Sequence, residues 1–163
     1  MKNQELMDKI NEQVTFEIAS GYVYLGMAAW AADNDWDGFS HFMYKQWEEE
    51  LEHANKMAKF LMDLGYPVTF GAIEAAPSEY KDVLDLAKTS LEHEQEVTQR
   101  INEIIDLARK YDDKRVEYFM QWYINEQVEE EDTFSTLIAK IERTNMNPAG
   151  LMILDGKLGR RED

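Results

Sequence analysis

Four long segments of the chain repeat apolar residues at alternating steps of three and four, the period of an amphipathic α-helix. They cover about residues 4–32, the stretch from a turn at 33–35 to Gly65, 82–111 and 114–144. A short fifth helix is expected over about 149–157, because the Asn-Pro pair before it resembles a cap followed by proline in a first helical turn. The pattern therefore predicts an all-α protein.

The connections between these segments predict how the helices are arranged. Asp33, Asn34 and Asp35 indicate a tight turn that also caps the second helix, and Asp112 and Asp113 are the only gap between the third and fourth. Residues 66–80 lack a helical period, and at ~3.3 Å per residue they can span ~50 Å, the length of a long helix. We therefore expect a four-helix bundle with a long crossover between the second and third helices, plus the short fifth helix.

Each of the four apolar stripes is polar at its centre. The interrupting residues are Glu17, Glu50, His53, Glu94, Gln127 and Glu130. Glu50 and His53 are one turn apart on their helix and point the same way. Burying an ionised carboxylate costs several kcal/mol unless something compensates it, and clustered carboxylate and imidazole groups are usually compensated by a metal ion.

The spacing of these residues from the turns places them at one level. Glu17 and Glu50 are equally far from the first turn, and Glu94 and Glu130 from the second. Each lies about seventeen residues, or ~26 Å, from its turn. A single such glutamate is more often a solvated edge residue, but four at one level on apolar stripes favour a metal site in the middle of the bundle.

Composition and charge narrow the kind of protein. A chain of 163 residues with 44% hydrophobic content is expected to form one domain over residues 1–163, with the bundle over about 4–144. The chain has no cysteine, so a metal must be held by oxygen and nitrogen ligands, which suits iron, manganese or zinc. The net charge of -16 argues against binding nucleic acid or an anionic membrane. Without a membrane-length apolar run or a signal-peptide pattern, we expect a soluble, cytoplasmic protein.

Three motifs resemble those of prokaryotic non-haem ferritins, and the resemblance extends along nearly the whole chain. They are Asn11-Glu12-Gln13, the stretch Trp47-Glu48-Glu49-Glu50-Leu51-Glu52-His53, and residues 121–131. The resemblance implies a ferritin-like fold and self-association into a shell, usually of 24 subunits. Such a shell oxidises Fe(II) with dioxygen or hydrogen peroxide and stores the ferric mineral inside.

The resemblance also implies a two-iron centre. Glu17, Glu50 and His53 would form the first iron site, and Glu50 would bridge to a second site completed by Glu94 and Glu130. Gln127 would stand beside the second iron. Bacterioferritins instead bring a second Glu-x-x-His from the fourth helix and a haem-ligating methionine, where this chain has Leu51. No haem is therefore expected.

A third iron site next to this pair is implied in the same way. It would consist of Glu49, Glu126 and Glu129 and would share Glu130. The residues alone indicate only a solvated acidic run at 129–131.

Four other side chains are interpreted as core, packing or surface residues, and for one of them two interpretations stay open. Tyr24, two turns above Glu17, is either a core residue or a neighbour of the site, and Trp122 is interpreted as packing rather than as a redox participant. His41 and His93 lie off the stripes and are expected at the surface.

Other functions predict different observations. A fixed-cofactor di-iron oxidoreductase or peroxidase of the ferritin-like superfamily would keep its iron in the site and would accumulate no mineral. A rubrerythrin-like peroxidase would normally add a cysteine-rich iron domain, and miniferritins place metal between subunits. A purely structural bundle would leave four buried carboxylates without a counter-charge, which is unfavourable.

Overall fold

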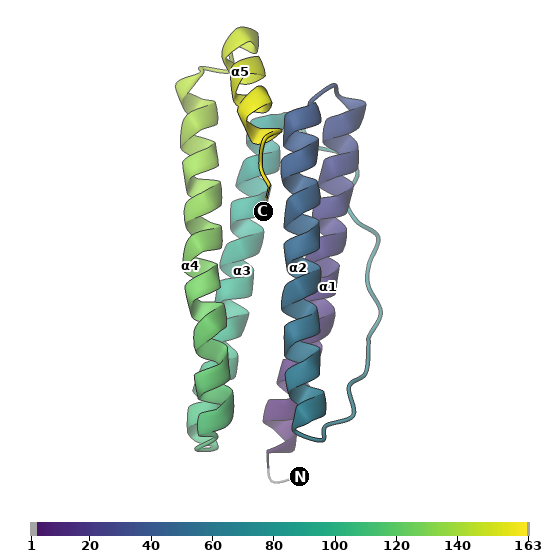
Figure 1. The fold of residues 1–163 in the computed structure, drawn as a ribbon, viewed down its shortest axis with the longest axis vertical. Coiled ribbons are helices and arrows are strands. Elements are labelled where there is room, and N and C mark those ends of the chain that lie inside the picture. Colours follow the sequence, from purple (N-terminus) through teal and green to yellow (C-terminus); the bar gives the residue numbers. More distant parts are fainter. Residues whose placement is uncertain (1–2, 163) are drawn as a thin grey trace.

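Five α-helices make up the part of the chain that the structure, a computed structural model, describes: residues 3–162 (Figure 1). They are α1 (Gln4–Asp33), α2 (Asp37–Asp63), α3 (Val83–Lys110), α4 (Lys114–Arg143) and α5 (Pro148–Leu158), and these described residues form no strand. The helices α1 and α2 form one antiparallel hairpin, and α3 and α4 form another (Figure 1). The all-α four-helix bundle with a short C-terminal helix is therefore confirmed.

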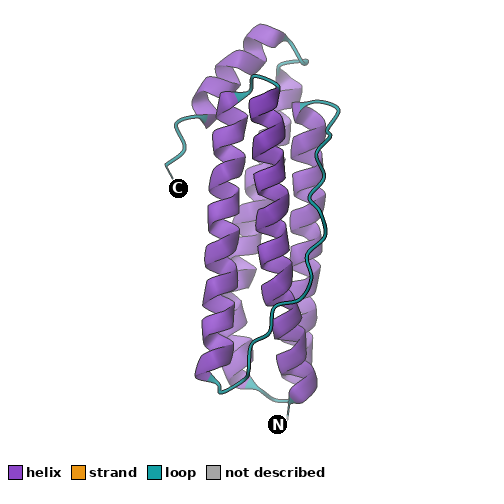
Figure 2. Cartoon of the chain, turned by 90° about the vertical axis from the view of Figure 1, so that its right-hand side faces the viewer, coloured by secondary structure: helices purple, strands orange, loops and turns teal. Residues whose placement is uncertain are grey.

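The crossover between α2 and α3 follows the outside of the first hairpin for the length of the bundle (Figure 2). Asn11 of α1 holds it, because its Nδ2 donates to Thr69 Oγ1 (3.1 Å) and its Oδ1 accepts from the Thr69 N–H (2.9 Å). Thr15 Oγ1 accepts from the Gly71 N–H at 3.1 Å. With this long connection α2 and α3 run in the same direction, as predicted.

The start of α2 differs from the sequence prediction. Asp33 is still part of α1, and the residue before α2 is Trp36, whose side chain makes no capping hydrogen bond. Asp155 of α5 instead accepts the N–H of Phe39 at 2.8 Å. The expected cap from residues 33–35 is therefore wrong, because a distant helix supplies the acceptor.

A glycine lets α5 dock at this place. A Cβ atom on Gly38 would lie 1.7 Å from the carbonyl oxygen of Asp155, so no other residue fits without moving α5. The short helix is consequently fixed against the first turn of α2.

The apolar core consists of two clusters with a polar layer between them. One cluster contains Val14, Ala54, Val97 and Tyr123, and the other contains Tyr24, Met43, Ala87 and Phe134, together with their neighbours. On each long helix, the buried polar residues fall between the members of the two clusters, except for Gln13, which lies beside Val14. The polar layer is thus enclosed along the bundle axis by apolar packing.

No described helix is long and apolar enough to cross a lipid bilayer.

Candidate metal centre

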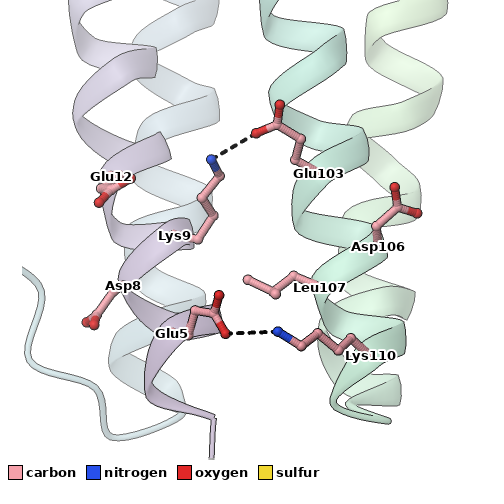
Figure 3. A pocket seen from close by; sticks show the side chains of 8 residues that line it. All are labelled: Glu5, Asp8, Lys9, Glu12, Glu103, Asp106, Leu107 and Lys110. Carbon is pink, nitrogen blue, oxygen red and sulfur yellow. Dashed lines mark hydrogen bonds and ion pairs between the residues drawn. The ribbon is translucent and has the colours of Figure 1, made fainter.

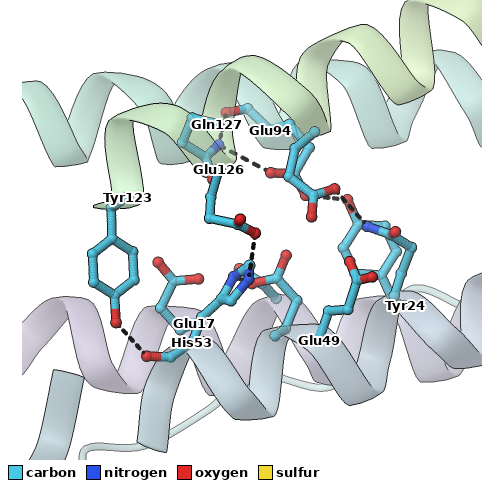
Figure 4. Close-up of polar contacts among 12 residues, drawn as sticks. Glu17, Tyr24, Glu49, His53, Glu94, Tyr123, Glu126 and Gln127 are labelled. Carbon is cyan, nitrogen blue, oxygen red and sulfur yellow. Dashed lines mark hydrogen bonds and ion pairs between the residues drawn. The ribbon is translucent and has the colours of Figure 1, made fainter. Parts of the chain in front are cut away.

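The first hairpin brings three ligand-type side chains together in the polar layer. Glu17 of α1 and Glu50 and His53 of α2 are buried, and one ligand atom of each lies within 4.8 Å of the others. His53 Nδ1 is 3.4 Å from Glu50 Oε2. Figure 4 shows Glu17 and His53 pointing into the same space between the helices. Two carboxylates and one imidazole at this separation can hold one divalent cation.

This group is short of hydrogen-bond donors. Gln13 Nε2 donates to one Glu17 oxygen at 3.0 Å, but the other Glu17 oxygen and both Glu50 oxygens are buried without a hydrogen-bond partner among the described residues. Burial raises the pKa of Glu50 well above its ordinary value, and the charges of Glu94 and Glu17 raise it further. Buried carboxylates are normally paired or bound to metal, so these free oxygens fit a cation.

The second hairpin contributes carboxylates that already accept hydrogen bonds. Tyr24 donates its hydroxyl to Glu94 Oε1 at 2.5 Å, and Gln127 Nε2 donates to Glu94 Oε2 at 3.1 Å. Gln46 Nε2 donates to Glu130 Oε2 at 2.8 Å. Burial raises the pKa of Glu94, and it raises that of Glu130 well above the ordinary value. Phenol and amide donors therefore orient this half of the layer (Figure 4).

A close approach of α1 and α2 positions Glu50. A Cβ atom on Gly21 would lie 3.2 Å from Trp47 Cδ1 and 3.3 Å from Glu50 Cβ. Both distances are tighter than ordinary van der Waals contact. The absence of a side chain at Gly21 thus lets the α2 backbone come near enough for Glu50 to face Glu17.

A second acidic group begins on the other side of the His53 ring. His53 Nε2 lies 3.3 Å from Glu126 Oε2, and His53, Glu126 and Glu130 have ligand atoms within 4.8 Å of one another. Glu49 lies close enough to Glu130 for its charge to raise the pKa of that carboxyl, after burial as the main cause. Glu129 is exposed and belongs to neither of the two groups. The structure therefore brings Glu126 and Glu49 to the centre more closely than Glu129.

Several surrounding residues differ from their sequence interpretation or add to it. Tyr24 is a neighbour of the site, because its hydroxyl donates to Glu94 in the polar layer. The expectation that His93 is a freely exposed surface residue is wrong, because its side chain is half-buried. Its ring stacks on Phe16, and its Nε2 lies 2.7 Å from Ser20 Oγ. Burial lowers the pKa of His93.

His41 and Trp122 are both partly covered. His41 Nε2 lies 2.5 Å from the carbonyl oxygen of Arg161, so His41 contacts the C-terminal segment rather than facing solvent freely. Trp122, which is 36% exposed, packs its ring edge-on against the ring of His53. Its position next to His53 agrees with packing.

Two glutamines of the layer were not assigned a role from sequence. Gln13 precedes Glu17 by four residues, and Gln46 precedes Glu50 by four on the same stripe. The spacing of Gln13, one helical turn before Glu17, was the signal in the sequence that could have indicated its contact with that carboxylate. The bond from Gln46 to Glu130 crosses between helices and needs the tertiary structure.

A surface groove lies between α1 and α3 (Figure 3), and none of the residues that line it belongs to the polar layer. Two ion pairs bridge it, Lys9 to Glu103 at 2.8 Å and Lys110 to Glu5 at 3.3 Å. Glu103 and Glu5 thus already have cationic partners, unlike the free oxygens in the polar layer.

A family model for the ferritin-like domain matches residues 7–144 of the chain. The chain belongs to the ferritin family. It is 35% identical over 161 residues to a bacterial non-heme ferritin of Staphylococcus saprophyticus, covering 99% of this chain and 96% of that protein. It is 32% identical over 158 residues to a bacterial non-heme ferritin of Escherichia coli, covering 97% and 96%. Ferritin-family membership therefore extends over nearly the full length.

Solved ferritin structures superpose on the whole fold. An open pore ferritin from the hyperthermophilic archaeon Archaeoglobus fulgidus is 37% identical, with a TM-score of 0.96 over 97% of this chain and 98% of that one. A humanized archaeal ferritin is 34% identical, with a TM-score of 0.97 over 98% of both chains. The polar layer therefore lies in a bundle that matches known ferritins end to end.

Proposed function

We propose that this ferritin-family protein stores iron, and that it oxidises Fe(II) at a two-iron centre in the polar layer. Glu17, Glu50 and His53 bind the first ion, and Glu50 bridges to a second ion held by Glu94 and Glu130. Three free, buried carboxylate oxygens on Glu17 and Glu50 carry this proposal. Without a cation these oxygens stay buried without a donor, and burial raises the pKa of the Glu50 carboxyl well above its ordinary value.

The donor set suits ferrous iron as a substrate. Four carboxylates match the charge of two Fe²⁺, and oxygen and imidazole ligands fit this ion. Two Fe²⁺ release two electrons, which together with two protons reduce one dioxygen to hydrogen peroxide or one hydrogen peroxide to two water molecules. Gln127, hydrogen-bonded to Glu94, stands beside the second ion. A single histidine in the site is expected to hold the product less firmly than two, so that oxidised iron can leave for a mineral.

A third iron site is part of this proposal. Glu49, Glu126 and Glu129 form it and share Glu130. The contact between Glu126 and His53 at 3.3 Å and the proximity of Glu49 to Glu130 support it. This site supplies an additional Fe²⁺ or an additional electron to the reaction.

Storage requires an enclosed space, which one bundle does not supply. We propose that copies of this chain assemble into a shell, with 24 subunits as the expected number. Exposed apolar side chains support such contacts, among them Met152 and Ile153 on α5 and Phe70 on the crossover. The strong negative charge disfavours nucleic acid and anionic membranes as partners, and we place the assembly in the cytoplasm.

The mass of the native assembly, measured with its iron content after Fe(II) and air are added, tests storage. We expect a soluble ferric mineral with far more than two irons per subunit. A fixed-cofactor di-iron oxidoreductase or peroxidase is the alternative, because its ligands also fit two ions. Saturation at two irons per subunit, with no mineral, would favour that alternative.

A further inference from the structure

The segment after α5 returns along α2 toward the polar layer (Figure 1). Arg161 contacts α2 along this path. Its Nη2 donates to Glu49 Oε1 at 2.8 Å, its Nη1 donates to the Phe42 carbonyl at 3.4 Å, and its guanidinium lies 4.4 Å from the centre of the Phe42 ring. The Arg161 carbonyl oxygen accepts from His41 Nε2 at 2.5 Å. Contacts to backbone, ring and carboxylate thus hold one arginine in place.

The base of this segment is fixed. Asp155 accepts the Phe39 N–H at the start of α2. Gly159 packs on Gly38, because a Cβ atom added to Gly159 would lie in ordinary van der Waals contact with Gly38 Cα, at 3.5 Å. Only the residues beyond Gly159 can move without undocking α5. Arg161 therefore lies on a short C-terminal arm, residues 160–162, whose first residue follows the docked Gly159.

The carboxylate that Arg161 contacts belongs to the proposed third iron site. The side chain of Glu49 is 29% exposed and that of Arg161 is 16% exposed, so the ion pair is only partly screened by solvent. The same Glu49 lies next to Glu130, which the third site shares with the two-iron centre. A guanidinium here supplies the positive charge that a metal ion would otherwise supply. A metal ion bound at Glu49 would have to share this carboxylate with Arg161 or displace it.

We propose that Arg161 is an internal competitor for the cation at the third site, so that filling this site releases the C-terminal arm from Glu49. The inference rests on the proposed third site. By linkage, what weakens the contact of Arg161 must strengthen cation binding, and cation binding must loosen the arm to the same degree. Arg161 is thus a specificity-determining residue of the third site, and it leaves the ligands of the two-iron centre untouched.

Calorimetric titration of the metal-free assembly with Zn²⁺, which has no redox chemistry here, tests the competition. We expect Arg161→Gln to bind the third zinc ion per subunit about fivefold more tightly, which is the effect of a part-buried ion pair of ordinary strength. Binding of the first two zinc ions should not change. Arg161→Lys retains a cation and should stay near the wild type. The neighbouring Arg160, which is exposed, provides the matched control Arg160→Gln, with no expected change.

The reciprocal effect is measured at the arm itself. Because the chain has no cysteine, Glu162→Cys accepts a single spin label next to Arg161. Its electron paramagnetic resonance spectrum should show faster motion once Zn²⁺ exceeds two ions per subunit. In the Arg161→Gln background the label should already move fast without metal.

A further variant separates failure of this inference from failure of the site. Glu49→Gln should remove or strongly weaken the third zinc ion, and if it has no effect then the proposed third site is wrong. If Glu49→Gln removes the third ion while Arg161→Gln leaves its affinity unchanged and the label does not respond, the site stands and the competition by Arg161 is refuted.

Discussion

The two halves of the polar layer are built from the same residue type but are prepared differently. The carboxylates of Glu17 and Glu50 keep three buried oxygens without a donor, whereas Glu94 and Glu130 accept hydrogen bonds from Tyr24, Gln127 and Gln46. A cation entering the first half replaces no hydrogen bond, but one entering the second half must displace donors or share oxygens with them. The first half should therefore bind the first metal ion. The hydrogen bonds of the second half should hold Glu94 and Glu130 in position until a second ion binds.

The largest expected effect concerns the carboxylate that would serve both ions. Glu50→Ala should slow the fast phase of Fe(II) oxidation by about a hundredfold or more, because metal-based charge stabilisation is worth several kcal/mol. Stopped-flow absorbance measures it. The exposed neighbour Glu52 gives the control Glu52→Ala, which should keep the fast phase. Rapid oxidation in Glu50→Ala would remove the two-iron centre from this layer.

Apolar substitutions should have opposite effects on stability in the two halves. Glu50→Leu removes a carboxylate without donors and should stabilise the metal-free protein by about 1–4 kcal/mol. Glu94→Leu leaves the buried Tyr24 hydroxyl without its acceptor, and should destabilise the metal-free protein by about 1–3 kcal/mol. Urea unfolding in the presence of a chelator gives both values. If both substitutions changed the free energy of unfolding in the same direction, the two halves would not differ in the way described.

The pH dependence of stability sharpens the same comparison. Burial raises the pKa of Glu50, Glu94 and Glu130 above the ordinary 4.5, so the folded state binds their protons more tightly than the unfolded state does. Their stabilising contribution is full below the unfolded pKa and is lost as pH rises through the raised folded values. Metal-free protein should thus lose stability on going from mildly acidic to alkaline pH, and Glu50→Leu should lose less.

The same protons should appear in solution when metal binds, because carboxylate ligands must be ionised. Calorimetry of Zn²⁺ binding in two buffers with different ionisation enthalpies measures their number. We expect fewer protons released from Glu50→Leu than from the wild type. A proton count that does not change would show that Glu50 is already ionised in the metal-free protein.

The smallest expected effect concerns the proposed third site. Replacing Glu49, Glu126 and Glu129 together by alanine should leave two-ion binding intact but change the number of irons oxidised per oxidant consumed. Stopped-flow oxidation with parallel oxygen-electrode readings measures this ratio. Unchanged stoichiometry together with an unchanged slow phase would make the three residues ordinary surface glutamates.

The helices and the level of the polar layer could be predicted because both depend on local information. The period of the apolar stripes determines which residues face inward, and equal distances from a turn put Glu17 opposite Glu50 in a hairpin. The crossover could be inferred from its length alone. These features use no contact between distant parts of the chain beyond the pairing of two helices.

The remaining features depend on contacts that periodicity does not contain. His93 lies off the main stripe, yet Phe16 of α1 covers it. The start of α2 takes its hydrogen-bond acceptor from Asp155, near the other end of the sequence. Arg161 reaches Glu49 only because α5 is docked on Gly38. Each involves a second surface of a helix, which one hydrophobic stripe cannot reveal.

Anomalous diffraction at the iron edge, from crystals of the protein soaked anaerobically in Fe(II), tests the central claim most directly. The account predicts an iron peak between Glu17, Glu50 and His53 at low Fe(II), followed by a second peak between Glu50, Glu94 and Glu130 as the concentration rises. Iron found only on the surface, with the polar layer still empty at saturating Fe(II), would contradict it.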